Sequence, residues 1–225
     1  MKHTLEAPIE IETGPNPTLS VIWMHGLGAD GNDFPPIVPE LGLPQDAAIR
    51  FIFPHAPMMP VSCNNGYVMR AWFDILSMAG GKRDVNADTV TESVELVRGL
   101  IRKENERGMP THRIVLAGFS QGGAMTYTVG LTHPEALGGM MVLSGYIPTP
   151  EWVQANAQAG NRSTPIFAAH GTYDDVLPIA LGEAARDLAQ QLNDKVEWHS
   201  WPMPHTLCYE EVQAMGEWLR ARLAA

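Results

Sequence analysis

The sequence predicts an α/β fold, with a mostly parallel central sheet and helices on both of its faces. Three observations support this class. Short apolar runs bounded by Gly or Pro alternate with longer segments in which apolar residues recur at helical spacing. The short runs are apolar almost throughout, which is typical of strands buried on both faces. Strands that alternate with helices form βαβ units and therefore a mostly parallel sheet.

The individual elements follow from the same patterns. Residues 84–107 place Val90, Val94, Val97 and Ile101 on one helical stripe, and residues 181–192 and 210–223 behave likewise. Residues 54–69 are rich in Pro, Met and Asn without a clear period, so we expect a long loop near the sheet edge. The predicted strands are residues 19–24, 49–53, 113–119, 139–144, 165–170 and 196–201.

Length and composition limit the class of protein. The 225 residues suit one domain spanning 1–225, since no linker, repeat or charge block divides them. The formal net charge of −10, with only 15 Lys and Arg, argues against a nucleic-acid partner. The two cysteines, Cys63 and Cys208, form neither a disulfide framework nor a zinc motif. Without a signal peptide or an apolar segment of membrane length, we expect a soluble, cytoplasmic protein.

The sequence Gly118-Phe-Ser-Gln-Gly122 follows a predicted strand and precedes a helical pattern. This is the context of a nucleophile elbow, in which a sharp turn forces Ser120 into a strained conformation and the glycines leave room for close chain approach. The pattern G-x-S-x-G also occurs by chance. Here both the strand and the helix are visible, so we predict that Ser120 is a nucleophile.

A serine hydroxyl needs a base, and in this arrangement an Asp or Glu and then a His follow later strands. Asp174 lies in the turn after the predicted strand 165–170, and its neighbour Asp175 is the alternative. His205 is the only histidine in the loop after the last strand, whereas His199 lies inside that strand. We therefore expect His205 to accept the Ser120 proton and Asp174 to orient the imidazole.

Developing negative charge on the substrate requires hydrogen-bond donors. The residue after the nucleophile, Gln121, supplies one backbone N–H, and Leu27 in the glycine-rich loop after the first predicted strand supplies the other. The segment from Gly26 to Gly31 also matches the dinucleotide pattern G-x-G-x-x-G. That fold needs an acidic residue at the end of the next strand, where this chain has Phe53-Pro54-His55. The oxyanion interpretation is therefore preferred.

Seven blocks together give the chain a family resemblance: VIWMHGLGADGNDF, FPHAP, RAWFDI, RIVLAGFSQGGAM, LSGY, HGTYDDVLP and WPMPH. The chain resembles the phospholipase/carboxylesterase family of small α/β-hydrolases, which includes bacterial carboxylesterases and acyl-protein thioesterases. The resemblance implies one α/β-hydrolase domain without a large cap, the triad Ser120, Asp174 and His205, the oxyanion donors Leu27 and Gln121, and no metal or cofactor. Pro204 and Phe73 depart from the Gly and Tyr that are common in the family.

The acyl group of a substrate needs an apolar surface near these residues. The apolar candidates are Met58, Met59, Met69, Trp72, Ile75 and Leu76, of which Met69, Trp72, Ile75 and Leu76 are the tentative substrate-binding set. For any single Met, core packing is the competing role. A chain of 225 residues leaves little room for a lid, so we expect an open site that favours short to medium acyl chains.

These features predict a serine carboxylesterase that acts on a small-molecule ester or thioester through an acyl-enzyme. The alternatives are an acyl-protein thioesterase, a lysophospholipase, an amidase or peptidase with the same triad, and a non-catalytic binding module on the same fold. An apolar patch around residues 54–69 would also allow a homodimer.

Overall fold

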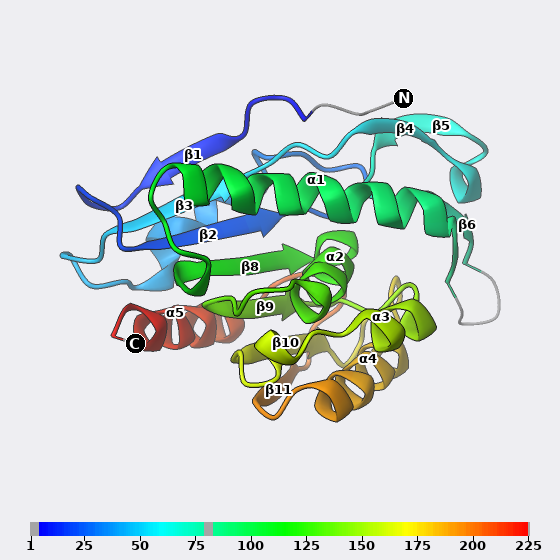
Figure 1. Cartoon of the computed structure of the whole chain (residues 1–225). Coiled ribbons are helices and arrows are strands. Elements are labelled where there is room, and N and C mark those ends of the chain that lie inside the picture. Colours follow the sequence, from blue (N-terminus) through cyan, green and yellow to red (C-terminus); the bar gives the residue numbers. More distant parts are fainter. Residues whose placement is uncertain (1–4, 79–82, 225) are drawn as a thin grey trace.

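The computed structural model describes residues 5–78 and 83–224 of the chain (Figure 1). Within them, a seven-stranded sheet has the order β1-β3-β2-β8-β9-β10-β11. The first strand pairs antiparallel with β3, and the other neighbours are parallel, which confirms the predicted α/β class. The strands are β1 (Ile9–Glu12), β2 (Leu19–Met24), β3 (Ile49–Phe53), β8 (Ile114–Phe119), β9 (Gly139–Leu143), β10 (Ile166–Gly171) and β11 (Val196–Trp201).

Helices cover both faces of this sheet. In Figure 1 the long helix α1 (green) runs along one face, and it packs there with α2 against β2 and β8. The same face carries α4 over β9 and β10, whereas α5 and the 3-10 helix η1 (Pro35–Leu41) cover the opposite face. The α-helices are α1 (Ala87–Glu106), α2 (Gln121–Thr132), α3 (Pro150–Asn156), α4 (Ile179–Leu192) and α5 (Tyr209–Leu223).

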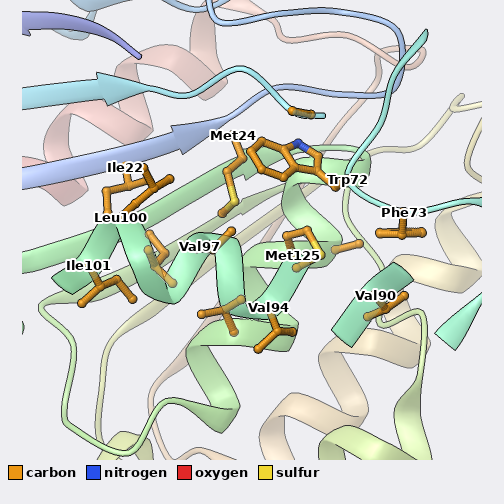
Figure 2. Packing of buried hydrophobic residues seen from close by; sticks show 14 of the residues in the cluster. Ile22, Met24, Trp72, Phe73, Val90, Val94, Val97, Leu100, Ile101 and Met125 are labelled. Carbon is orange, nitrogen blue, oxygen red and sulfur yellow. The ribbon is translucent and has the colours of Figure 1, made fainter. Parts of the chain in front are cut away.

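Alternate residues of each central strand enter different cores. Ile22 and Met24 of β2 pack with the apolar stripe of α1, as Figure 2 shows, while Val21 and Trp23 face α5 and η1. Because both sets of side chains are buried, the strand is apolar at every position except Ser20, whose hydroxyl is hydrogen bonded to Glu104. This explains why the sequence shows unbroken apolar runs rather than an alternating pattern.

The segment predicted as a long loop, residues 54–69, is more ordered than expected. It contains β4 (Met58–Val61), a short 3-10 helix (Ser62–Asn64) and the start of β5 (Tyr67–Arg70), with β4 and β5 paired as an antiparallel hairpin. Only alternate residues of β4 are buried, and its composition of Met and Pro hides this two-residue period. The loop prediction was therefore wrong over these residues.

The helix predicted over residues 84–107 begins later than expected. Asp84–Val85 form the short strand β7, which pairs with β6 (Ile75–Ser77). The helix starts at Ala87 because the Asn86 side chain caps it, accepting a hydrogen bond of 3.1 Å from the Asp88 N–H. The described residues of the insertion between β3 and α1 thus form two small antiparallel strand pairs rather than a cap domain.

The order of the strands determines where a ligand can bind. The chain passes from β2 to β3 on one side, and then returns to place β8 on the other side of β2. Loops that leave the carboxyl ends of β2 and β8 therefore diverge, and such a switch point is where open α/β sheets bind ligands. Leu27 follows β2 and Ser120 follows β8. Because these strands are neighbours in the sheet, both residues lie at this switch point.

Within the described residues, none of the helices combines the length and the apolar character needed to cross a membrane. The cysteines Cys63 and Cys208 are both free and partly buried.

Candidate active site

Ser120 occupies the turn between β8 and α2. Its backbone angles are φ 55° and ψ −114°, a region that costs a non-glycine residue free energy on the order of 1–3 kcal/mol. The turn is tight enough that a Cβ on Gly118 would lie 2.2 Å from the Gly122 carbonyl oxygen, and one on Gly122 would lie 2.2 Å from that of Met24. Only glycine fits either position, so the sequence pattern G-x-S-x-G follows from chain packing here.

Asp174 lies in the turn after β10, and its carboxylate is buried. Its Oδ1 atom accepts hydrogen bonds from the backbone N–H groups of Val176 (3.0 Å) and Leu177 (2.7 Å). Its Oδ2 atom lies 2.6 Å from Nδ1 of His205. Burial raises the pKa of Asp174, but the His205 and Leu177 hydrogen bonds outweigh it and the pKa is lowered overall. Asp174 is therefore ionised at neutral pH, whereas its neighbour Asp175 is exposed.

His205 joins this carboxylate to the serine. Its Nδ1 faces Asp174, and its Nε2 lies 2.9 Å from the Ser120 hydroxyl oxygen. An ionised carboxylate only accepts hydrogen bonds, so the ring proton is on Nδ1 and Nε2 is free to accept the Ser120 proton. The ring also packs on Phe119, with the centroids 4.7 Å apart. Three residues predicted from separate segments thus form one hydrogen-bonded chain.

The loops that carry these residues are joined by a close backbone contact. The Tyr173 N–H donates to the Met203 carbonyl at 3.1 Å, and a Cβ on Gly171 would lie 2.3 Å from that same oxygen. Pro204, which replaces the expected Gly, lies in this loop, and its carbonyl accepts a hydrogen bond from the Thr206 N–H. The substitution leaves His205 in hydrogen-bonding contact with both partners.

A cavity of about 280 Å³ opens beside Ser120. Leu27 and Gln121, the two expected oxyanion donors, both line it together with His205. Gly26 packs against the elbow so closely that a Cβ on it would lie 3.4 Å from Ser120 Cβ. The glycine-rich loop therefore lies beside the serine, as the oxyanion interpretation requires. The remaining walls are mainly apolar, with the polar residues Asp33, Asn64 and Arg83 among them.

The four residues expected to bind the acyl group lie in different environments, and only one of them lines the cavity. Ile75 lines the cavity. Trp72 is completely buried in the core under α1, and its indole is hydrogen bonded to the His25 carbonyl rather than exposed to substrate (Figure 2). Met69 contacts the glycine-rich loop, where a Cβ on Gly28 would lie 3.7 Å from its sulfur, and Leu76 is about half exposed at the surface. Sequence alone could not separate these positions because all four are apolar and close together along the chain.

Two buried histidines near the site had no assigned role. The Nε2–H of His170 donates to the Leu177 carbonyl at 2.8 Å and lies 3.5 Å from Asp174 Oδ2, so this ring supports the turn that carries Asp174. The Nδ1 atom of His25 lies 2.7 Å from the Gly26 carbonyl oxygen in the glycine-rich loop. Both precede a glycine at the end of a strand, and that HG pair is the one sequence signal that distinguishes them. Tyr146, which ends the block LSGY, also lines the cavity.

Within the described residues, no group of three or more His, Cys, Asp or Glu side chains is arranged to hold a metal ion.

Comparison with known proteins decides the family. Residues 8–223 match the family model described as phospholipase/carboxylesterase, which is nearly the whole chain. The chain belongs to the phospholipase/carboxylesterase family. It is accordingly a hydrolase of the carboxylesterase type, and the family implies an ester substrate.

Individual relatives of this family member agree. The chain is 36% identical over 210 residues to acyl-protein thioesterase 1 of Yarrowia lipolytica, with 92% of each chain covered. It is 32% identical over 206 residues to carboxylesterase SOBER1 of Arabidopsis thaliana, with 90% of each covered. The crystal structure of SOBER1 superposes with a TM-score of 0.86, covering 91% of this chain and 99% of that one.

Proposed function

We propose that the chain is a serine carboxylesterase that hydrolyses short- to medium-chain carboxylic esters through an acyl-enzyme. The observation that carries this proposal is the pair of hydrogen bonds made by His205, 2.6 Å to Asp174 and 2.9 Å to Ser120. These distances let one imidazole accept a proton from the nucleophile while its other nitrogen is held by a carboxylate.

The proposed reaction has two acyl-transfer steps. Ser120 Oγ attacks the ester carbonyl carbon while its proton moves to His205 Nε2, and the carbonyl oxygen becomes an oxyanion held by the N–H groups of Leu27 and Gln121. The carbon–oxygen bond to the leaving alcohol then breaks, and the alcohol takes the proton from His205. Water repeats the same steps on the acyl-enzyme and releases the acid, which restores Ser120.

The preference for short to medium chains rests on the size of the cavity. About 280 Å³ beside Ser120 is small compared with pockets that enclose drug-sized ligands. Exposed apolar side chains at its rim, Met78 and Val176, would contact a longer chain only at the surface. A long chain would therefore add less binding free energy per methylene than a short one.

Thioester hydrolysis is the second candidate, because the relative from Yarrowia lipolytica is named an acyl-protein thioesterase. The same triad serves both chemistries, since a thiol leaves from the tetrahedral intermediate as an alcohol does. The leaving group is the only part of the mechanism that would differ.

The test is hydrolysis of p-nitrophenyl esters from acetate to palmitate, beside S-acyl thioesters of the same chain lengths, by wild type and by Ser120→Ala. We expect a maximum of kcat/KM at short or medium oxygen esters, and a fall of at least about 10⁴-fold in Ser120→Ala because the nucleophile is lost. Wild-type turnover that persists in folded Ser120→Ala would contradict the triad. A folded wild type that hydrolyses only thioesters would favour the second candidate.

A further inference from the structure

The two proposed oxyanion donors belong to segments far apart along the chain. Leu27 lies in a loop after β2, and Gln121 is the first residue of α2. An oxyanion hole stabilises the transition state only if its donors are already in position when the charge develops. The contacts behind the site show how a loop N–H can be kept in place.

His25 fixes the orientation of the Gly26–Leu27 peptide. Its Nδ1 lies 2.7 Å from the Gly26 carbonyl oxygen, and its Nε2 accepts a hydrogen bond of 3.0 Å from the Ala56 N–H. A carbonyl only accepts and a backbone N–H only donates, so the ring proton is on Nδ1. In a planar trans peptide the C=O and the next N–H point in opposite directions. Holding the Gly26 carbonyl therefore directs the Leu27 N–H away from His25, which lies behind the loop.

His25 keeps this tautomer over the working range of pH. The side chain is only 1% exposed, and burial lowers its pKa to about 4. At neutral pH the ring is uncharged, so Nε2 remains an acceptor for Ala56.

Trp72 contacts His25 through both a hydrogen bond and ring packing. Its indole Nε1–H donates to the His25 carbonyl at 2.9 Å, and the two rings pack with their centroids 5.6 Å apart. The Trp72 side chain is completely buried, and it lies beside Met24 in Figure 2.

Gln121 closes the connection through its side chain. Its Oε1 accepts a hydrogen bond of 2.7 Å from the Trp72 N–H, and its Nε2 donates at 2.7 Å to the Phe73 carbonyl. Gln121, which offers one donor N–H, is thus hydrogen bonded to Trp72. Trp72 is hydrogen bonded to His25, and His25 holds the peptide that carries the Leu27 N–H.

We propose that His25, Trp72 and the Gln121 side chain form an oxyanion brace, which sets the two donor N–H groups at a fixed separation. The proposal rests on the function proposed above. Neither His25 nor Trp72 lines the cavity, so both are positioning residues that act through Leu27 and Gln121. This role replaces the substrate contact expected for Trp72.

The brace acts mainly on the transition state, because the oxyanion forms only there. Its loss should lower kcat and leave KM nearly unchanged. Removing one oxyanion donor outright costs on the order of 10²- to 10³-fold in kcat, and a displaced donor should cost less. For Trp72→Phe, which removes the indole N–H but keeps an aromatic ring, we expect kcat to fall about 10- to 100-fold with KM within about threefold.

The chain offers a matched control in Trp23. It is 1% exposed, and its Nε1 has no hydrogen-bond partner among the described residues. It packs in the core on the opposite face of β2, against Phe34 and Phe53. Trp23→Phe therefore removes the same atoms from an equally buried site without removing a hydrogen bond. A general loss of packing would affect both variants alike, whereas the brace predicts that only Trp72→Phe loses kcat.

A second readout does not depend on how much protein is folded. Ser120 Oγ would add to the carbonyl carbon of an alkyl trifluoromethyl ketone, and the ketone oxygen would become an oxyanion in the hole. The carboxylate product binds without a covalent bond to Ser120. We expect the Ki of the ketone to rise about 10- to 100-fold in Trp72→Phe and in His25→Ala, with the Ki of the product changed by less than about threefold. His25→Asn, which keeps an amide donor near the Nδ1 position, should recover part of the loss.

The outcomes separate the two proposals. Equal kcat values for Trp72→Phe and Trp23→Phe, or an unchanged ketone Ki in the Trp72 and His25 variants, would overturn the brace even if Ser120→Ala is inactive. Should Trp72→Phe not fold, the ketone Ki of His25→Asn and His25→Ala decides alone. Hydrolysis that survives in Ser120→Ala would instead overturn the proposed function.

Discussion

At the scale of single residues, Asp174 shows how two oxygens of one carboxylate divide their tasks. Oδ1 accepts the backbone N–H groups of Val176 and Leu177, which fixes the side chain, and Oδ2 faces His205. The sequence placed two adjacent aspartates in this turn, and only the buried one contacts the imidazole.

This division predicts the effect of Asp174→Asn. The N–H groups of Val176 and Leu177 would still donate to the oxygen of the asparagine amide. The amide NH₂ would therefore face Nδ1 of His205. The ring proton would then move to Nε2, which could no longer accept the Ser120 proton. We expect kcat to fall about 10⁴-fold with the fold intact.

Asp175→Asn is the matched control, because Asp175 is exposed on the same turn. Steady-state kinetics on p-nitrophenyl esters should show its kcat within about twofold of wild type. A similar loss in both variants would mean that the carboxylate role has been assigned to the wrong residue or to the turn as a whole.

The three triad candidates left clearer signals in the sequence than the residues that support them. Ser120, Asp174 and His205 each follow a strand end in the expected order, and these are the side chains that meet in the structure. The support supplied by His25 and His170 depends on contacts with backbone carbonyls, which leave no pattern in the sequence beyond a following glycine.

At the scale of elements, the start of α5 contains a buried carboxyl group that the proposed mechanism does not use. Glu211 lies in the first turn of α5 and is completely buried. Burial raises its pKa to about 8, although the Cys208 backbone N–H favours the charged form. The folded protein therefore carries this carboxyl protonated at neutral pH, whereas the unfolded chain ionises near its ordinary value of 4.5.

The sign of the resulting pH dependence follows from linkage. A group with a raised pKa stabilises the folded state fully below its unfolded pKa, and this contribution is lost as the pH rises toward the folded value. Between about pH 4.5 and 8 the free energy of unfolding should therefore fall. Glu211→Gln removes the titration and should be more stable than wild type by on the order of 4 kcal/mol at pH 8, with little difference near pH 4.

Urea unfolding of both proteins at these two pH values measures the difference. Glu210→Gln on the exposed side of the same helix turn is the control, and we expect it to follow wild type. A Glu211→Gln variant whose stability tracks wild type at both pH values would show that the buried carboxyl does not carry a proton in the folded state.

Elements were predictable where burial imposed a clear apolar pattern, either a continuous run in a strand or a helical stripe. The central strands and α4 and α5 begin and end within a few residues of the predicted positions. The sequence analysis did not predict β1 or the hairpin β4-β5, because each of these strands has only four residues. The alternation of Ile and Glu in β1 is too short to stand out, and the Met and Pro residues of β4 hide its two-residue period.

At the scale of the whole molecule, the two ends of the sheet have different roles. The carboxyl ends of β2, β8, β10 and β11 supply Leu27, Ser120, Asp174 and His205. At the opposite end of the sheet, the buried Glu104 carboxylate binds Arg50 and Arg107, each at 2.9 Å, and accepts the Ser20 hydroxyl. These three partners compensate the cost of burying the carboxylate, so removing one of them would destabilise the fold at an end of the sheet that is remote from the site.

This arrangement explains why the grouping of the site residues could be predicted before their geometry. The order of strand ends along the chain follows from the sequence pattern, and the parallel sheet brings those ends to one edge. The distances between side chains depend on turns such as 171–178, whose shape is set by individual hydrogen bonds.

The central claim, that Ser120 forms an acyl-enzyme, is tested most directly by intact-protein mass spectrometry after treatment with an alkyl fluorophosphonate. Such a reagent is attacked by an activated serine, loses fluoride and remains bound as a stable tetrahedral adduct. We predict one adduct per chain, mapped by proteolysis to the peptide that contains Ser120 and absent from Ser120→Ala. Ester hydrolysis by wild type without any adduct on Ser120, or with the adduct on another residue, would contradict the account.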